Sequence, residues 1–229
     1  IRDKGGLTYW AVGLMNDYLC ERLGSITIED LDYASDLHTQ KKTEAADLGT
    51  RIHELVSKHI KGEEIDLDKL LAEDPRVSQG FDSFIEWEKK VKPQWLASER
   101  IVYSKKYNYA GILDAVAKIN GKVVLIDFKS SNNLYDEYAF QTAAYQIANE
   151  EMGLEKIDHR IVIRFSKDTE EEYNAKELKK KIKKERQRKP YYKPEPYAIF
   201  EQRDYKENKK DKDAFVAMIK VKRRLDELK

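Results

Sequence analysis

The sequence contains a single cysteine, Cys20, among its 229 residues, and it has no long apolar run. One cysteine cannot form an internal disulfide, and it cannot by itself hold a zinc ion or an iron–sulfur cluster. No window approaches the ~18 apolar residues of a membrane-spanning helix, and the start "IRDKGGLTYW" has no signal-peptide core. We therefore expect a soluble, intracellular protein of a prokaryote or of a phage-infected host. Because the chain begins at Ile1 rather than Met, a missing upstream segment and a location in an organelle stay open.

An excess of one charge sign is also missing. The chain has 43 Lys and Arg against 42 Asp and Glu, which gives a net charge of +1. The whole molecule therefore has no general attraction for nucleic acid, and any basic surface must be local. Apolar residues make up 41% and aromatic residues 10% of the chain, which is enough to form a packed core.

Hydrophobic periodicity changes along the chain and predicts the fold class. Helical spacing dominates the first third, and a period of two begins near Trp95. We expect an α/β (α+β) fold in which a mixed central sheet, with the order α-β-β-β-α-β, is flanked by helices. The predicted helices are 7–19, 28–60 (as one or two helices), 76–93, 135–151, 175–189 and 212–228, and the predicted strands are 97–104, 109–119, 122–130 and 159–166.

The second and third predicted strands form a hairpin that carries unexpected charges. Asn120-Gly121 between two alternating apolar runs predicts a two-residue type I′ turn. The register that this turn sets places Asp114 directly opposite Asp127. Lys129 then lies on the same face as Asp127, because side chains alternate along a strand.

Two carboxylates at this spacing require compensation. Directly paired residues have Cβ atoms roughly 4.5–5.5 Å apart, and like charges there destabilise a sheet. A shared proton or a cation relieves the repulsion, and Mg²⁺ binds through one or two carboxylates together with substrate phosphates. The hairpin therefore suggests a metal site beside a lysine. The alternative is a solvated sheet end at which Lys129 simply pairs with an aspartate.

The motifs "GILD", "IDFK" and "QTAAY", in this order, resemble those of the PD-(D/E)XK nuclease superfamily. More narrowly, they are similar to the RecB-type exonuclease branch, which includes phage exonucleases and the mitochondrial genome maintenance exonuclease. That branch has a helical histidine, a G-x-x-D strand, a D/E-x-K strand and Q-x-x-x-Y on the following helix. The matching positions here are His53, 111–114, 127–129, Gln141 and Tyr145.

The resemblance implies a role for each matching residue. Asp114 and Asp127 would bind Mg²⁺ or Mn²⁺, with His53 completing the metal site and the main-chain carbonyl of Phe128 as a further ligand. Lys129 would orient or deprotonate the attacking water and stabilise charge on the phosphorus. A cation lowers the pKa of its bound water, and a fixed ammonium counters developing negative charge.

The resemblance, which spans roughly 49–165, also implies the fold and the activity. We expect a restriction-endonuclease-like core within a single nuclease domain, 1–229, made of a helical part (1–93), a catalytic sheet and helix (94–166) and a basic and C-terminal helix (167–229). The expected function is exonucleolytic hydrolysis of DNA, single- or double-stranded. Relatives with a four-cysteine iron–sulfur cluster are excluded, because Cys20 is alone.

Other function classes and partners stay open. One class is a structure-selective or site-specific endonuclease on the same fold, and another is a non-catalytic nucleic-acid-binding module. A homo-oligomer, or a partner protein in recombination or replication, is compatible with the sequence, as are roles in repair. We expect no membrane partner.

Four further residues are candidates for contact with DNA. Gln141 and Tyr145 lie one helical turn apart in an inward-facing stripe, where they would contact the DNA backbone or position the catalytic strand. An amide satisfied by the backbone is the alternative. Ser130 and Ser131 follow Lys129 and would meet a phosphate, although the same position suits an ordinary loop.

A local excess of positive charge lies near the C-terminus. The segment 176–189 has nine Lys or Arg residues against two acidic ones, and Tyr191, Tyr192 and Tyr197 follow it. Basic residues with aromatic rings suit single-stranded nucleic acid. A solvated charged face is the alternative interpretation.

Overall fold

The computed structural model describes residues 5–72, 74–188, 190, 193, 195–206 and 208–228. The chain divides into two compact units, Ile1–Thr50 and Arg51–Lys229. Three positions of the basic and aromatic segment predicted to contact DNA, namely 189, 191 and 192, lie outside the described residues.

The first unit is helical. It contains α1 (Gly5–Cys20) and the longer part of α2 (Ile28–Lys61), whose last turns belong to the second unit. The side chains of Thr27 and Asp30 cap the start of α2, because each accepts a hydrogen bond from the other's backbone N–H at 3.0–3.1 Å. Asp30 also accepts a 2.9 Å hydrogen bond from the Tyr18 hydroxyl, which fixes the end of α1 against the start of α2.

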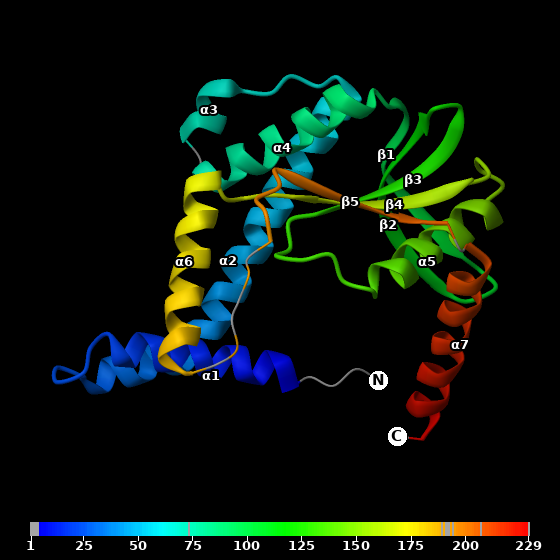
Figure 1. The fold of residues 1–229 in the computed structure, drawn as a ribbon. Coiled ribbons are helices and arrows are strands. Elements are labelled where there is room, and N and C mark those ends of the chain that lie inside the picture. Colours follow the sequence, from blue (N-terminus) through cyan, green and yellow to red (C-terminus); the bar gives the residue numbers. More distant parts are fainter. Residues whose placement is uncertain are drawn as a thin grey trace. The chain divides into compact units, whose positions relative to one another are not determined.

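The second unit is built on a five-stranded mixed sheet (Figure 1), whose strands are β1 (Gln94–Ser104), β2 (Tyr109–Ile119), β3 (Lys122–Lys129), β4 (His159–Phe165) and β5 (Phe200–Tyr205). The strands lie side by side in their chain order. Strands β3 and β4 run parallel, and the other neighbouring pairs are antiparallel. A parallel pair requires a crossover connection, and α5 (Tyr138–Glu151) provides it.

The remaining helices are α3 (Leu67–Ala72), α4 (Pro75–Val91), α6 (Glu170–Arg186) and α7 (Asn208–Glu227). Helix α4 begins where the Asp74 side chain accepts a hydrogen bond from the Arg76 N–H, with Pro75 in the first turn. A capping box between Thr169 and Glu172 starts α6. Among the described helices, none is both long and apolar enough to cross a bilayer.

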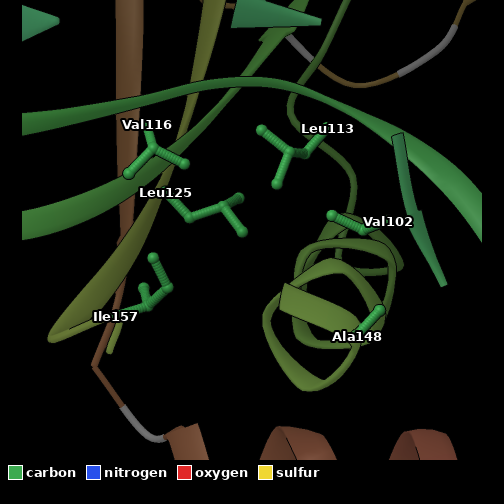
Figure 2. Close-up of a cluster of buried hydrophobic side chains, with 6 residues drawn as sticks. All are labelled: Val102, Leu113, Val116, Leu125, Ala148 and Ile157. Atoms are coloured by element: carbon green, nitrogen blue, oxygen red, sulfur yellow. The ribbon is translucent and has the colours of Figure 1, made fainter. Parts of the chain in front are cut away.

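The two faces of the sheet have different cores. Figure 2 shows the cluster between the sheet and α5, which consists of Val102, Leu113, Val116, Leu125, Ala148 and Ile157. On the other face, Phe84 and Trp87 of α4 pack against Phe128 of β3, with ring centroids 5.8 and 6.3 Å apart. Burying one such side chain stabilises the fold by about 1.5–3 kcal/mol. Because side chains alternate along β3, Leu125, Asp127 and Lys129 lie on the α5 face.

The turn between β2 and β3 confirms the predicted register. Asn120 and Gly121 both have positive φ, 50° and 76°, as a type I′ turn requires. Ile119 pairs with Lys122, and the same register continues to the pair formed by Ala115 and Ile126.

The predicted fold class is confirmed, since a mixed sheet with the order α-β-β-β-α-β is flanked by helices. The sequence-based assignment missed β5, which pairs with β4 at the edge of the sheet. It also started α6 too late, because the acidic first turn at 170–172 belongs to that helix. Polar edge strands and charged helix starts carry little apolar periodicity, which explains both differences.

Candidate functional site

The β2–β3 ladder opens where the charged residues begin. The last pair in register is Ala115 with Ile126, so Asp114 and Asp127 are not a ladder pair, in contrast to the prediction. On the other side of β2, the register passes over Glu99 and Asp114. Glu99 has a φ of 47°, in the left-handed region that residues other than glycine seldom adopt, whereas the register shift of this ladder lies between Trp95 and Ala97. The Asp114 carboxylate instead accepts a 2.7 Å hydrogen bond from the backbone N–H of Phe128.

Asp127 is a buried carboxylate with incomplete compensation. Its side chain is 1% exposed. Burial, and then the nearby charge of Asp114, raise its pKa to about 7, although Lys129 opposes the shift. The Lys129 ammonium lies 2.6 Å from Asp127 Oδ2, yet this shielded oxygen accepts no well-aligned hydrogen bond. The contact is therefore an ion pair that leaves bonding capacity on the carboxylate.

His53 reaches the site from α2. Its Nδ1 lies 3.6 Å from Asp114 Oδ1, and its ring meets Phe128 edge-on, with the ring centroids 6.4 Å apart. Burial lowers the pKa of His53, but contact with Asp114 outweighs this effect, so the net pKa is raised. The structure therefore brings the predicted histidine next to the first of the two aspartates.

Lys129 is held between a carboxylate and an aromatic ring. Burial lowers its pKa, but the charge of Asp127 more than compensates, and the net pKa is raised. Its ammonium lies 5.0 Å from the centre of the Tyr138 ring, within the range of a cation–π interaction. Sequence reasoning did not assign Tyr138 to the site. The available signal was its position, one helical turn before Gln141 on the same stripe of α5.

The pair on α5 is connected to β2 through a glycine. Gln141 Nε2 donates a 3.0 Å hydrogen bond to the Tyr145 hydroxyl. The Tyr145 ring covers Gly111 so closely that a Cβ there would lie 2.7 Å from Cε1. The glycine of G-x-x-D and the tyrosine of Q-x-x-x-Y are thus direct neighbours. The charges of Asp127 and Asp114 reach Tyr145, whose pKa is raised mainly by burial.

The two serines after β3 differ in their contacts. Ser131 accepts a 3.1 Å hydrogen bond from the Tyr138 hydroxyl and donates one of 2.8 Å to the Asn133 carbonyl. Within the described residues, the half-buried Ser130 makes no side-chain hydrogen bond. Ser131 therefore ties the loop to Tyr138.

Two neighbouring candidates have other partners. Glu99, considered as a third carboxylate, is exposed and lies 3.4 Å from Lys61. Tyr197, considered for base stacking, packs its ring on Tyr173 and donates a 2.9 Å hydrogen bond to the Asp168 carbonyl. Its ring is thus engaged within the fold.

The donors at this site suit a cation bound by two carboxylates. Across 5–72 and the other described ranges, no group of three or more His, Cys, Asp or Glu side chains is arranged to hold a metal ion. The charges of Asp114 and Asp127 nevertheless interact, and Mg²⁺ is commonly held by one or two carboxylates with water and substrate phosphate. The shielded Oδ2 and the raised pKa of Asp127 indicate that Lys129 compensates this buried carboxylate only in part. A divalent cation would supply the rest, so the donor set fits.

Comparisons with known proteins place this geometry in a family. No curated protein matches the chain. The family model of the PD-(D/E)XK nuclease superfamily matches residues 30–220, which include every predicted site residue. Nucleases of this superfamily act on DNA and generally use divalent metal ions. The chain belongs to the PD-(D/E)XK nuclease superfamily.

Proposed function

We propose that the protein is a DNA exonuclease of the RecB type, which hydrolyses phosphodiester bonds at DNA ends with Mg²⁺ or Mn²⁺. The observation that carries the nuclease activity is the buried Asp127 beside Asp114 and Lys129 at the open end of the hairpin. The exonuclease assignment rests on the combination of His53 with the Gln141–Tyr145 pair. We further propose that residues 1–229 work as one nuclease domain.

The proposed site residues have two roles, which are to bind the metal ion and to position the phosphate. Asp114 and Asp127 would hold the ion, with His53 and the Phe128 carbonyl as additional ligands. The bound ion would lower the pKa of water and neutralise phosphate charge. The hydrogen bond from the Phe128 N–H fixes the Asp114 carboxylate before any ion binds, so one part of the site is preorganised.

Lys129 would act on the attacking water and on the phosphate. In hydrolysis the water oxygen forms a bond to phosphorus, the bond to the leaving sugar oxygen breaks, and the proton lost by the water is balanced by one taken up by the leaving oxygen. The Lys129 ammonium stabilises the negative charge that develops on phosphorus. Its position depends on two contacts, with Asp127 and with the Tyr138 ring.

The α5 pair would position the reacting strand. Gln141 and Tyr145 are hydrogen-bonded to each other, and Tyr145 rests on Gly111, three residues before Asp114. Contact of this pair with the DNA backbone would align the phosphate with the carboxylates. Ser130 offers a hydroxyl to the phosphate, and Ser131 supports the loop.

The test uses end-labelled linear DNA and closed circular DNA, each single- and double-stranded, with Mg²⁺, Mn²⁺ or EDTA. Wild type is compared with Lys129→Ala and with a matched control, Lys122→Ala, at the exposed turn end of β3. We expect metal-dependent loss of the linear substrates only, abolished by Lys129→Ala and unaffected by Lys122→Ala.

Each other outcome selects a different function. Cleavage of closed circles would identify an endonuclease. DNA binding without cleavage under any metal would identify a binding module. Equal cleavage by Lys129→Ala and wild type would show that the catalytic residues lie elsewhere.

A further inference from the structure

The backbone of the loop at 166–168, directly after β4, is held by hydrogen bonds at both of its ends. Ser166 donates its backbone N–H to the Ile199 carbonyl at 2.9 Å, and its own carbonyl accepts a 3.0 Å hydrogen bond from the Ser83 hydroxyl. The carbonyl of Asp168 accepts a 2.9 Å hydrogen bond from the Tyr197 hydroxyl. The middle residue, Lys167, is therefore presented from a fixed backbone.

Lys167 is a half-buried cation among other cations. Burial lowers its pKa, and the charges of Arg76, Lys176 and Arg164 lower it further, while Asp168 opposes the shift. A lysine in such surroundings would be stabilised by an anion. The position is thus electrostatically prepared for a negatively charged ligand.

The nearby acidic side chains do not supply that anion. Each is already paired with another cation: Asp168 with Lys176 at 2.5 Å, Glu201 with Arg164 at 2.7 Å, and Asp74 with Arg76 at 2.5 Å. None of the described carboxylates lies within ion-pair distance of the Lys167 ammonium. Arg164 keeps one shielded donor, Nε, without an acceptor.

This cation lies at the same edge of the sheet as the candidate catalytic lysine. Because β3 and β4 are parallel, the segments that follow them leave from the same end, where ligands of parallel strands commonly bind. Arg164 is the registered neighbour of Lys129, and Lys167 follows it by three residues. Three residues span at most roughly 10 Å, which equals the axial rise of about three nucleotides on one strand of duplex DNA.

We propose that Lys167, assisted by Arg164, binds a phosphate of the DNA strand one to three nucleotides from the scissile phosphate. The proposal rests on the proposed nuclease function and assigns a second contact for the same substrate strand. It accounts for a hydrogen-bonded loop that presents a half-buried lysine without an internal ion-pair partner among the described residues.

The first experiment measures binding without cleavage. A fluorescent oligonucleotide is titrated in EDTA with wild type, Lys167→Gln, Lys167→Arg and, as the matched control, Lys122→Gln. We expect Lys167→Gln to bind about tenfold more weakly. The slope of log K against log[salt] should become shallower by about 0.7, which is the contribution of one phosphate contact on a single strand. Lys167→Arg should retain most of the affinity, and Lys122→Gln should match wild type.

The second experiment locates the phosphate. Uncharged methylphosphonate linkages are placed singly along the oligonucleotide. At one position the uncharged linkage should weaken binding to wild type about tenfold and leave binding to Lys167→Gln unchanged, because this variant has already lost the same contact. The assignment is wrong if, at every position, the loss of affinity from the uncharged linkage multiplies with the loss from Lys167→Gln. It is also wrong if Lys167→Gln binds as tightly as wild type.

Folding and catalysis are controlled separately. Removing a half-buried charge that has no ion-pair partner in the described part of the chain should not lower the unfolding midpoint of Lys167→Gln, which circular dichroism checks. In cleavage assays we expect a higher KM with kcat within about twofold of wild type, as for a contact made equally in ground and transition states. Because the binding measurements need no cleavage, they test Lys167 even if the protein proves not to be a nuclease.

Discussion

The two ends of the β2–β3 hairpin differ in how their strands pair and in which side chains they bury. At the turn end, backbone pairing continues in register from Ile119 and Lys122 to Ala115 and Ile126, and apolar side chains fill both faces. At the open end, the ladder stops and a buried carboxylate, Asp127, takes the next place on the α5 face. The turn end has the pattern that stabilises a sheet, whereas the open end departs from it, as is common at functional sites.

The departure at the open end is local because the surroundings compensate for it. The Phe128 N–H, which a regular ladder would pair with a carbonyl of β2, finds the Asp114 carboxylate instead. The α4 aromatic cluster holds the other side of Phe128. A rigid hydrophobic support therefore allows two carboxylates to lie close together without unfolding the strand end.

The largest expected difference between the two ends is in catalysis. Asp127→Asn keeps the shape of the side chain but removes the charge that would hold the ion, so cleavage should fall by about 10³-fold or more. Lys118→Ala, at an exposed position near the turn of the same hairpin, should cleave within twofold of wild type. Initial rates of release of a 5′ or 3′ label measure both. A loss of similar size in Lys118→Ala would remove the distinction between the ends.

The same substitution should have the opposite effect on stability. The pKa of Asp127 is raised from 3.8 to about 7, mainly by burial. Between these values the folded state keeps a proton that the unfolded state has lost, so in EDTA the stability contributed by this group falls as the pH rises. Asp127→Asn removes this effect, and its advantage over wild type should grow by about 2–3 kcal/mol from pH 5 to pH 8.

Urea unfolding at several pH values measures this growth. The charges facing Asp127 are those of Asp114, Lys129 and His53. Because the Asp127 charge raises the pKa of His53, the difference between the two curves reports the carboxylate together with its coupling to this histidine. A difference that does not change with pH would mean that Asp127 is ionised in the folded protein at pH 5. Adding Mg²⁺ at pH 8 should reduce the difference, because the ion stabilises the wild-type site.

Two glycines offer a matched comparison of the ends. A methyl group at Gly111 would overlap the Tyr145 ring, whereas Gly121 has open space around it but a φ of 76°. Gly111→Ala should lower stability by about 2 kcal/mol through overpacking and reduce cleavage about tenfold, since the ring moves off β2. Gly121→Ala should lower stability by about 1 kcal/mol through left-handed strain and leave kcat unchanged. Unfolding curves and kcat together separate the two effects, and equal kcat values would show that Tyr145 does not support the site.

The parts of the fold with strong local signals could be predicted from the sequence. The Asn120-Gly121 turn and the alternation of β2 and β3 were sufficient for the bounds of β2 and for the hairpin register. The helical spacing of Gln141 and Tyr145 placed both on one stripe of α5, and the structure joins them by a hydrogen bond. In these cases one periodic pattern determines the local geometry.

The parts that could not be predicted depend on tertiary neighbours. Strand β5 is largely polar and exposed, so only pairing with β4 identifies it as a strand. The departure at Asp114 coincides with the left-handed residue Glu99 on the neighbouring strand β1, which the local pattern of β2 does not indicate. The surroundings of Lys167 combine side chains from α4, β4 and α6, which lie far apart in the sequence.

The smallest expected effect concerns Tyr138, whose ring faces the Lys129 ammonium at 5.0 Å. A partly buried cation–π contact contributes about 1 kcal/mol, so Tyr138→Leu should reduce kcat about fivefold. Tyr138→Phe retains the ring and should restore kcat, although it lacks the hydroxyl that bonds to Ser131. A packing defect alone would lower the unfolding free energy without this rescue pattern. If Tyr138→Phe loses as much kcat as Tyr138→Leu, the hydroxyl and its loop contact position the lysine, and the ring does not.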